Sequence, residues 1–249
     1  MSGHSKWHSI RHKKGKIDAQ RGKIFTRLIK ELTVAARMGG GDPNGNARLR
    51  TAIAGAKAAN MPADNIDRAI KKGTGELEGV SYEEITYEGY GPAGVAVMID
   101  VMTDNKNRTV ADIRHIISKN GGNLGAANCV GWMFHRKGVI QVSAEDANED
   151  ELLEIALDAG AEDMTNEGDT FQILTAVENF EDVRSTLEQK GIPMLSAELS
   201  RLPENTVKIT DAKEAAKVMK LMDALENSDD VQNVYANFDI PEEILESLE

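Results

Sequence analysis

Residues 82–103, "YEEITYEGYGPAGVAVMIDVMT", decide the fold class, because their pattern is that of a β-hairpin. The first half is rich in β-branched and aromatic residues, and the second is nearly continuous in apolar residues over 95–102, as in a buried strand. Glycines and Pro92 separate the halves over 89–94 and suit a turn. The hairpin therefore predicts a β-sheet that begins at this point of the chain.

The turn "GYGPAG" (89–94) also matches the dinucleotide-binding pattern G-x-G-x-x-G letter for letter. That site requires a strand before the glycines and a helix after them, whose N-terminus holds the pyrophosphate. Here "VAVMID" (95–100) continues as a strand. The sequence thus argues against a nucleotide site in this loop.

The hairpin is followed by one helix and one more strand. Asn107 or Thr109 is expected to begin the helix, which runs to Lys119, and the strand is expected at 129–135. This piece, 79–136, lacks a second helix to cover its sheet. Residues 200–249 can supply one, because a strand at 207–210, a helix capped by Thr210 or Asp211, and the strand "VQNVYANF" follow one another there. We therefore expect the two pieces to form a single split domain.

The intervening residues, 137–199, predict a complete unit of their own. Their elements follow the order β-α-β-β-α-β, which is the ferredoxin-like pattern. "NEGD" (166–169) is a hairpin signal between the two middle strands. We expect this domain to be inserted in the split domain.

The N-terminal residues, 1–78, predict three helices. Apolar residues recur at helical spacing over 17–38, over 47–60 after the capping residue Asn46, and over 63–72, where Pro62 is expected in the first turn and Gly73 at the end. The predicted fold class is α+β multidomain. An N-terminal all-α helical domain (1–78) precedes two α+β domains, of which the ferredoxin-like one (137–199) is inserted in the other (79–136 plus 200–249).

Charge is divided unevenly along the chain. Residues 1–75 carry sixteen Lys and Arg against five Asp and Glu, a net charge of +11, whereas the other 174 residues carry −23. A block of positive charge predicts a phosphate-binding surface, and the acidic remainder predicts a protein partner. The candidate nucleic-acid-binding residues are Lys6, Trp7, Arg11, Lys13, Lys14, Lys16, Arg21, Lys23 and Arg27. Trp7 has two open interpretations, a hydrophobic plug against the helices or a stacking platform for an unpaired base.

Two further groups have both a binding and a structural interpretation. His4, His8 and His12 recur every four residues, but no carboxylate supports them, and contacts to phosphates or bases fit them better than a metal ion. For "DNKNRT" (104–109), one interpretation is a loop that ends in a helix cap, and the other is a binding site in a cleft between domains. That possible cleft or loop site would comprise Asn105, Asn107, Arg108 and Asn123. No metal and no cofactor is expected.

Other classes are disfavoured by what the sequence lacks. It has no apolar run of the length that spans a bilayer and no apolar signal region at its start, so a cytoplasmic protein is expected. The single cysteine, Cys129, excludes a disulfide within the chain. His115 falls on a helix and His135 at a strand end, and neither has an evident nucleophile, so we expect no enzyme.

Together these motifs resemble the YebC/PmpR family over nearly the whole chain. The motifs are "GHSKW" (3–7), "DAQRGKIF" (18–25), "GGGDP" (39–43), "NARLR" (46–50), "NMP" (60–62), "YEGYGP" (87–92), "DNKNRT" (104–109) and "GGNLG" (121–125). The resemblance implies an N-terminal helical domain and two α+β domains, the third inserted in the second. At "NCVGWMF" (128–134) the chain has Asn128 and Cys129 where that family more usually has Gly-Ser, so no role is carried over there.

The resemblance also implies a class of function. Members are described as probable transcriptional regulators that bind DNA, mitochondrial relatives are translational activators, and bacterial relatives are linked to the ribosome. The leading hypothesis is a non-enzymatic DNA-binding regulator. Its main alternative is a translation factor that binds ribosomal or transfer RNA, with the loops at 104–109 and 121–125 near that RNA. An enzyme with a small ligand in the interdomain cleft is the third.

Overall fold

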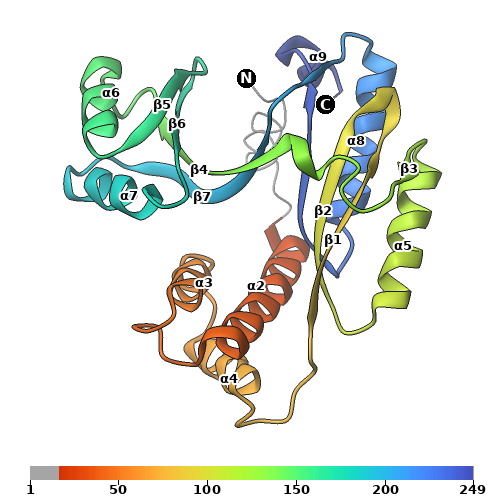
Figure 1. Ribbon diagram of the computed structural model, residues 1–249. Helices are drawn as coiled ribbons and strands as arrows, with labels where there is room; N and C mark the ends of the chain where they lie inside the picture. Colours follow the sequence, from red (N-terminus) through yellow and green to blue (C-terminus); the bar gives the residue numbers. More distant parts are fainter. Residues whose placement is uncertain (1–16, 249) are drawn as a thin grey trace. The chain divides into compact units, whose positions relative to one another are not determined.

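The computed structural model describes residues 17–248. They belong to two compact units, one formed by residues 131–206 and the other by the chain on either side of it. The second unit contains the helical module and the split α+β domain, and the first contains the ferredoxin-like domain (Figure 1). None of the described helices is long and apolar enough to cross a membrane.

Three helices form the helical module, and they are α2 (Ile17–Gly39), α3 (Ala47–Ala58) and α4 (Ala63–Thr74). Their core is built around Leu32, Leu49 and several alanines, all almost completely buried. Asn46 caps α3 as expected, since its Oδ1 accepts the N–H of Leu49 at 3.0 Å, and its Nδ2 donates to the carbonyl of Ala35 at 2.8 Å. One side chain thus begins α3 and ties it to α2.

The end of α4 differs from the prediction. Pro62 lies at the N-cap rather than in the first turn, and the helix passes through Gly73 and ends at Thr74, with Gly75 as a C-cap whose φ of 84° is left-handed. Gly73 has another reason to be glycine: a Cβ there would lie 2.4 Å from the Thr33 carbonyl oxygen. The glycine permits close packing of α4 on α2, and it does not stop the helix.

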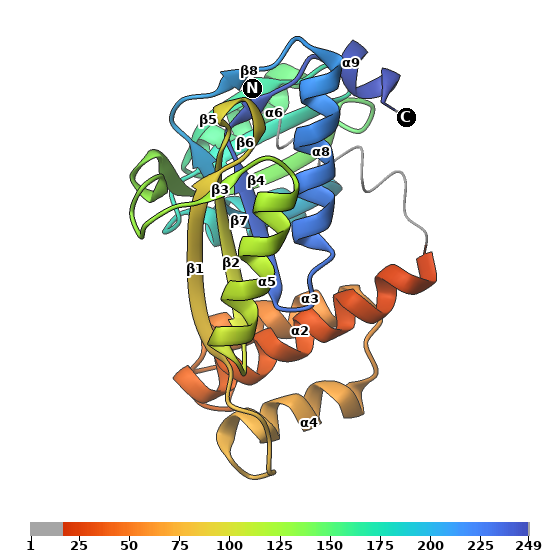
Figure 2. The ribbon, with the colours of Figure 1, turned by 90° about the vertical axis from the view of Figure 1, so that its right-hand side faces the viewer.

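The split domain has a four-stranded antiparallel sheet in the order β3-β1-β2-β9. Its elements are β1 (Glu83–Tyr90), β2 (Ala96–Thr103), α5 (Lys106–Lys119), β3 (Asn123–Leu124), β8 (Val207–Lys208), α8 (Ala212–Glu226), β9 (Val231–Ala236), β10 (Phe238–Asp239) and α9 (Glu242–Ser247). Helices α5 and α8 lie side by side on one face of this sheet (Figure 2). The pairing of β2 with β9 confirms that the C-terminal residues complete the sheet begun by the hairpin.

The turn at 89–94 is the hairpin connection that the sequence predicts. A single 3-10 turn, Pro92–Gly94, joins β1 to β2, and Ala93 and Gly94 have φ of 56° and 76°. The chain then enters a buried strand and not a helix. The glycines here therefore form a turn between two strands. No helix N-terminus follows them that could bind a phosphate.

The strand expected at 129–135 was wrong. Glu88 accepts the backbone N–H groups of Asn128 and Val130 at 2.9 and 2.8 Å, and Asn128 has a φ of 64°, so the chain turns here. A 3-10 turn (Gly131–Met133) follows, and the strand begins only at Phe134. The short strand β3 was not expected, and α5 begins after Asn105 instead of at Asn107 or Thr109.

The ferredoxin-like unit has the sheet order β5-β6-β4-β7, antiparallel throughout. Its elements are β4 (Phe134–Ser143), α6 (Glu149–Asp158), β5 (Ala161–Asn166), β6 (Thr170–Thr175), α7 (Phe180–Gln189) and β7 (Met194–Pro203). This order confirms the β-α-β-β-α-β prediction. Strands β4 and β7 are longer than expected, so their ladder passes both expected boundaries, 137 and 199.

Candidate nucleic-acid interface

The basic face of α2 contacts the C-terminal end of α8. Lys23 Nζ donates to Asn227 Oδ1 at 2.9 Å, and the Arg27 guanidinium donates to the Glu226 carbonyl. Lys30, one turn further along α2, donates to the Asp229 carbonyl at 2.8 Å. The last carbonyls of a helix lack partners within the helix and carry partial negative charge, so cations are favourable there.

Lys30 reaches the most buried part of this contact. It is 6% exposed, and its Nζ forms a 2.8 Å ion pair with the carboxylate of Asp230, itself 7% exposed. Asp230 also accepts Thr109 Oγ1 at 2.7 Å and the Arg108 guanidinium at 2.9 Å. Burial raises the pKa of Asp230, but the hydrogen bonds from Lys30, Thr109 and Arg108 outweigh it and hold that pKa at about 2.

A second ionic contact joins α3 to β1. The guanidinium of Arg48 donates to both carboxylate oxygens of Glu31, at 2.7 and 2.9 Å, and to both of Glu84, at 2.6 and 3.0 Å. The hydrogen bonds from Arg48 lower the pKa of Glu84. Arg37 adds hydrogen bonds to Ser81 Oγ and to the Tyr82 carbonyl. Much of the positive charge of the helical module is therefore used to hold the module on the split domain.

The sequence-predicted residues fall into three groups. Lys6, Trp7, Arg11, Lys13, Lys14 and Lys16, with the three N-terminal histidines, lie outside the described residues. Arg21 belongs to α2, but its side chain is outside the described part. Lys23 and Arg27 make the contacts with α8 given above. Their roles in binding phosphate stay predictions, and that role would require both side chains to leave the end of α8.

Two exposed cations on α3 were missed. Arg50 and Lys57 are both exposed and lie seven residues apart, two helical turns along the same face. Arg50 donates to the Pro43 carbonyl at 3.0 Å, and neither residue forms an ion pair with a described residue. Among the described α-helices, α3 is the only one that carries Lys or Arg and no carboxylate. The absence of acidic residues from the segment was the signal available in the sequence.

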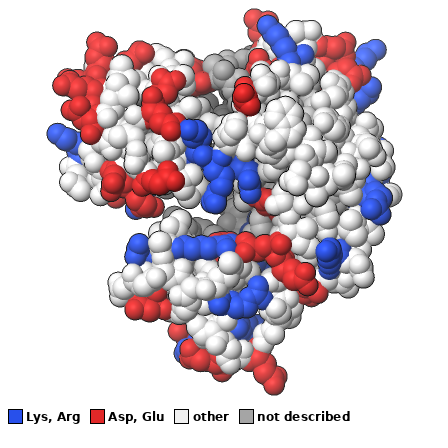
Figure 3. All heavy atoms as spheres, in the orientation of Figure 1, with Lys and Arg blue, Asp and Glu red and all other residues white. Residues whose placement is uncertain are grey.

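On α4 the cations are mixed with carboxylates. Arg68 and Lys72 are exposed there, but Asp64 and Asp67 share the helix, and Asp67 pairs with Lys71 at 2.7 Å. Figure 3 likewise shows blue and red side chains interleaved over the helical module on the face it draws. Helix α3 is thus the part of the described module best suited to an anionic polymer.

The "DNKNRT" residues serve the fold. Asn105 caps α5, since its Oδ1 accepts the N–H of Arg108 at 3.1 Å, and the Arg108 side chain pairs with Asp104 and Asp230. Asn107 is exposed in the first turn of α5, and Asn123 is exposed in β3. The helix-cap interpretation is confirmed, whereas a ligand-binding role for these four residues stays a prediction.

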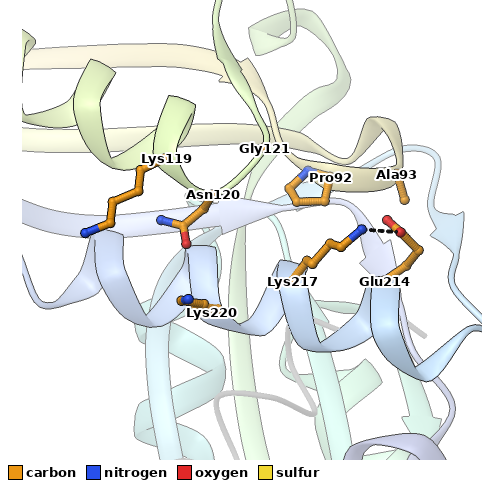
Figure 4. Close-up of a pocket in the computed structure, with 8 residues that line it drawn as sticks. All are labelled: Pro92, Ala93, Lys119, Asn120, Gly121, Glu214, Lys217 and Lys220. Atoms are coloured by element: carbon orange, nitrogen blue, oxygen red, sulfur yellow. Dashed lines mark hydrogen bonds and ion pairs between the residues drawn. The ribbon is translucent and has the colours of Figure 1, made fainter.

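A hollow of about 390 Å³ lies between the C-terminal end of α5, the turn at Pro92 and α8 (Figure 4). Lys119, Lys217 and Lys220 line it, and Lys217 pairs with Glu214 at 2.7 Å. The close-up shows Lys119 at one end and the Lys217–Glu214 pair at the other, so the ammonium groups do not converge on one point. We assign no ligand to it.

The described residues include two histidines, His115 and His135. His115 is exposed on α5, and His135 Nε2 lies 3.6 Å from Glu204 at an exposed position of β4. Residues 17–248 contain no cluster of three or more His, Cys, Asp or Glu that could hold a metal ion.

Comparison with known proteins identifies the family. Residues 5–76 match the model of the TACO1/YebC protein N-terminal domain, and residues 82–238 match that of the TACO1/YebC second and third domain. The chain therefore belongs to the TACO1/YebC family.

Its relatives are similar over their full length. A "Probable transcriptional regulatory protein" of Syntrophobacter fumaroxidans is 59% identical over 248 residues, covering 100% of both chains. One from Geobacter sulfurreducens is 60% identical over 248 residues, covering 100% of both. The crystal structure of a conserved hypothetical protein from Aquifex aeolicus, 54% identical, superposes with a TM-score of 0.84 over 92% of this chain and 95% of that one.

Proposed function

We propose that this protein is a DNA-binding transcriptional regulator that grips the phosphate backbone through residues 1–16 and the exposed face of α3. One observation carries the proposal: residues 1–75 hold a net charge of +11 in a chain of −12, and the described part of that segment leaves Arg50 and Lys57 exposed on a helix without carboxylates. The names of the relatives support a regulatory role. The acidic α+β domains would be repelled by DNA and would recruit a protein partner.

The regulatory role in this proposal needs no catalysis. Of the two histidines in residues 17–248, His115 is exposed and His135 lies near Glu204, and phosphate contacts position a protein on DNA without any chemistry. Phosphate contacts alone do not distinguish one base sequence from another. A sequence preference would therefore come from base contacts by residues 1–16 or from the shape of the DNA.

Deletion of residues 2–16 tests the proposal. It removes five cations and leaves α2, α3 and α4 in place, so duplex binding at low salt is expected to fall by orders of magnitude, with little change in Tm. Replacement of Lys208 and Lys213 by Ala is the control, because both lie on the split domain. Unchanged affinity after the deletion would contradict the proposal. A chelator that weakens binding as strongly as the deletion would instead favour a metal at the three N-terminal histidines.

The alternative from the sequence, a translation factor that binds ribosomal or transfer RNA, predicts the same dependence on charge. Crosslinking in cells, followed by sequencing of the bound DNA and RNA, separates the two. Enrichment of chromosomal fragments supports the regulator, and enrichment of ribosomal or transfer RNA without DNA supports the translation factor.

A further inference from the structure

The helical module and the split domain each have an apolar core of their own. The core of the module includes Leu32 and Leu49, that of the split domain includes Ile99 and Leu221, and the two clusters share no residue. The partly buried apolar residues that pack on each cluster also come from its own part of the chain. We therefore expect each part to keep its fold when the two move apart.

Among residues 17–248, one linker joins the two parts. Residues 75–82 lie between α4 and β1, contain neither helix nor strand, and are exposed from Gly75 to Ser81. Arg37 donates to Ser81 Oγ at 2.6 Å and to the carbonyl of Tyr82. Exposed linkers of this kind are where the parts of a chain move relative to each other.

Cations of α2 hold the module at the C-terminal end of α8. Lys23 and Arg27 donate to the last residues of that helix. Lys30 donates to three acceptors, among them Asp230 Oδ1 at 2.8 Å. Val34, one turn further along the same face, is completely buried. The closed arrangement thus provides acceptors for three cations and buries an apolar side chain, so it is favoured in the absence of a ligand.

The same three cations are groups that a phosphate backbone would bind. Ammonium and guanidinium groups donate to phosphate oxygens as they donate to carbonyls and carboxylates. While Lys23, Arg27 and Lys30 donate to the split domain, a polyanion has to compete with these acceptors. An arrangement in which the module has left α8 would offer a polyanion three further cations. A ligand shifts such an equilibrium by its greater affinity for one of the two arrangements.

We propose that the contact of α2 with the end of α8 is an autoinhibitory latch, in which the split domain occupies Lys23, Arg27 and Lys30 and so limits the positive surface that the helical module offers to DNA. Opening is a movement of the module about residues 75–82 with both apolar cores intact. The identity of the polyanion rests on the proposed function. The latch goes beyond that function, because it assigns a second and regulated set of cations besides residues 1–16 and α3.

A distance measurement tests the latch without DNA. Full-length protein with Cys129→Ser, Ala54→Cys and Ala216→Cys carries one spin label on α3 and one on α8, both at exposed positions. Asp230→Asn removes the carboxylate of the buried ion pair and should add longer distances to the distribution measured by double electron–electron resonance. Asp229→Asn is the matched control, because it removes the same charge from an exposed neighbour. Its distribution should equal that of the labelled protein without either change.

Salt dependence tests whether the latch hides cations from DNA. Each phosphate contact contributes about 0.9 to the steepness of log K against log salt on a duplex. Asp230→Asn should therefore steepen the slope by about 2 to 3 as the three cations become available, and Asp229→Asn should leave it unchanged. In the Asp230→Asn protein, Lys23→Ala with Arg27→Ala should then reduce the slope by about 2. In the closed protein the same pair should have no effect on it.

A second variant covers the case in which Asp230→Asn loses its far-UV circular dichroism signal and so does not fold. Lys30→Ala breaks the same ion pair from the other side and leaves Asp230 its hydrogen bonds from Arg108 and Thr109. No buried carboxylate is then left without a partner. Lys30→Ala should also add longer distances between the labels, and it should steepen the slope by about 2, since Lys23 and Arg27 become available.

The outcomes separate the latch from the proposed function. Distance distributions of Asp230→Asn or Lys30→Ala that equal that of Asp229→Asn would overturn the latch, because the ion pair would then not hold the module. Longer distances without a steeper slope would overturn its autoinhibitory role. If deletion of residues 2–16 leaves duplex binding unchanged, the proposed function fails, and the distance measurement still decides whether the latch exists.

Discussion

Helices α2 and α3 belong to one module and both carry cations at helical spacing, yet their cations face different surroundings. Lys23, Arg27 and Lys30 of α2 meet the C-terminal end of α8 and the buried carboxylate of Asp230. Arg50 and Lys57 of α3 are exposed. Net charge along the sequence therefore locates a basic segment, whereas carbonyls and carboxylates elsewhere in the fold decide which of its cations remain available to a ligand.

Asp230→Ala should have the largest effect, because it removes the partner that holds α2 in place. Lys30 would be left buried without its carboxylate, which typically costs about 3–5 kcal/mol. Urea denaturation measures this loss. Asp229→Ala is the control, since Lys30 contacts only the backbone carbonyl of exposed Asp229, and a change within about 0.5 kcal/mol is expected. Equal losses in the two variants would show that the ion pair does not hold the module.

The same carboxylate predicts a pH dependence. The pKa of Asp230 is lowered to about 2 in the folded protein, against about 3.9 in an unfolded chain. Its contribution, about 2 kcal/mol, is present above pH 4 or so and is lost as the pH falls toward about 2. The stability of Asp230→Asn should therefore fall less steeply with acid over that interval. Parallel curves for the two proteins would contradict the assignment.

Arg48→Lys should have a smaller effect. Lysine keeps the charge but lacks the planar guanidinium that donates to both Glu31 and Glu84. Because the Arg48 side chain is partly exposed, we expect the free energy of unfolding to fall by about 1 kcal/mol. The pKa of Glu84, lowered by the hydrogen bonds of Arg48, should rise toward its ordinary value in Arg48→Met. NMR titration measures it. An unchanged pKa in Arg48→Met would show that another group lowers it.

Most of the fold was predictable from the sequence because its elements are strongly patterned. The apolar run at 95–102 indicated a buried strand, and it became the centre of the sheet. The strand at 129–135 was wrong because Glu88, forty residues earlier, accepts the backbone N–H groups that such a strand would have used. A contact at that separation leaves no trace in local periodicity.

The candidate site was less predictable for the same reason. The phosphate role predicted for Lys23 and Arg27 rested on their own helix, and nothing local reveals that the end of α8 lies beside them. Helix α3 could have been identified, since the absence of acidic residues is visible in the letters "ARLRTAIAGAKA".

The salt dependence of duplex DNA binding by two double variants tests the contrast between α2 and α3 most directly. Each lost phosphate contact reduces the slope of log K against log salt by about 0.9, so Arg50→Ala with Lys57→Ala should reduce it by about 2. Lys23→Ala with Arg27→Ala lowers the net charge equally and should leave the slope unchanged. A reduction of about 2 in the α2 variant, with none in the α3 variant, would contradict this assignment and place the phosphates on α2. Equal reductions would contradict it as well, because they would show a diffuse field in place of a docking face.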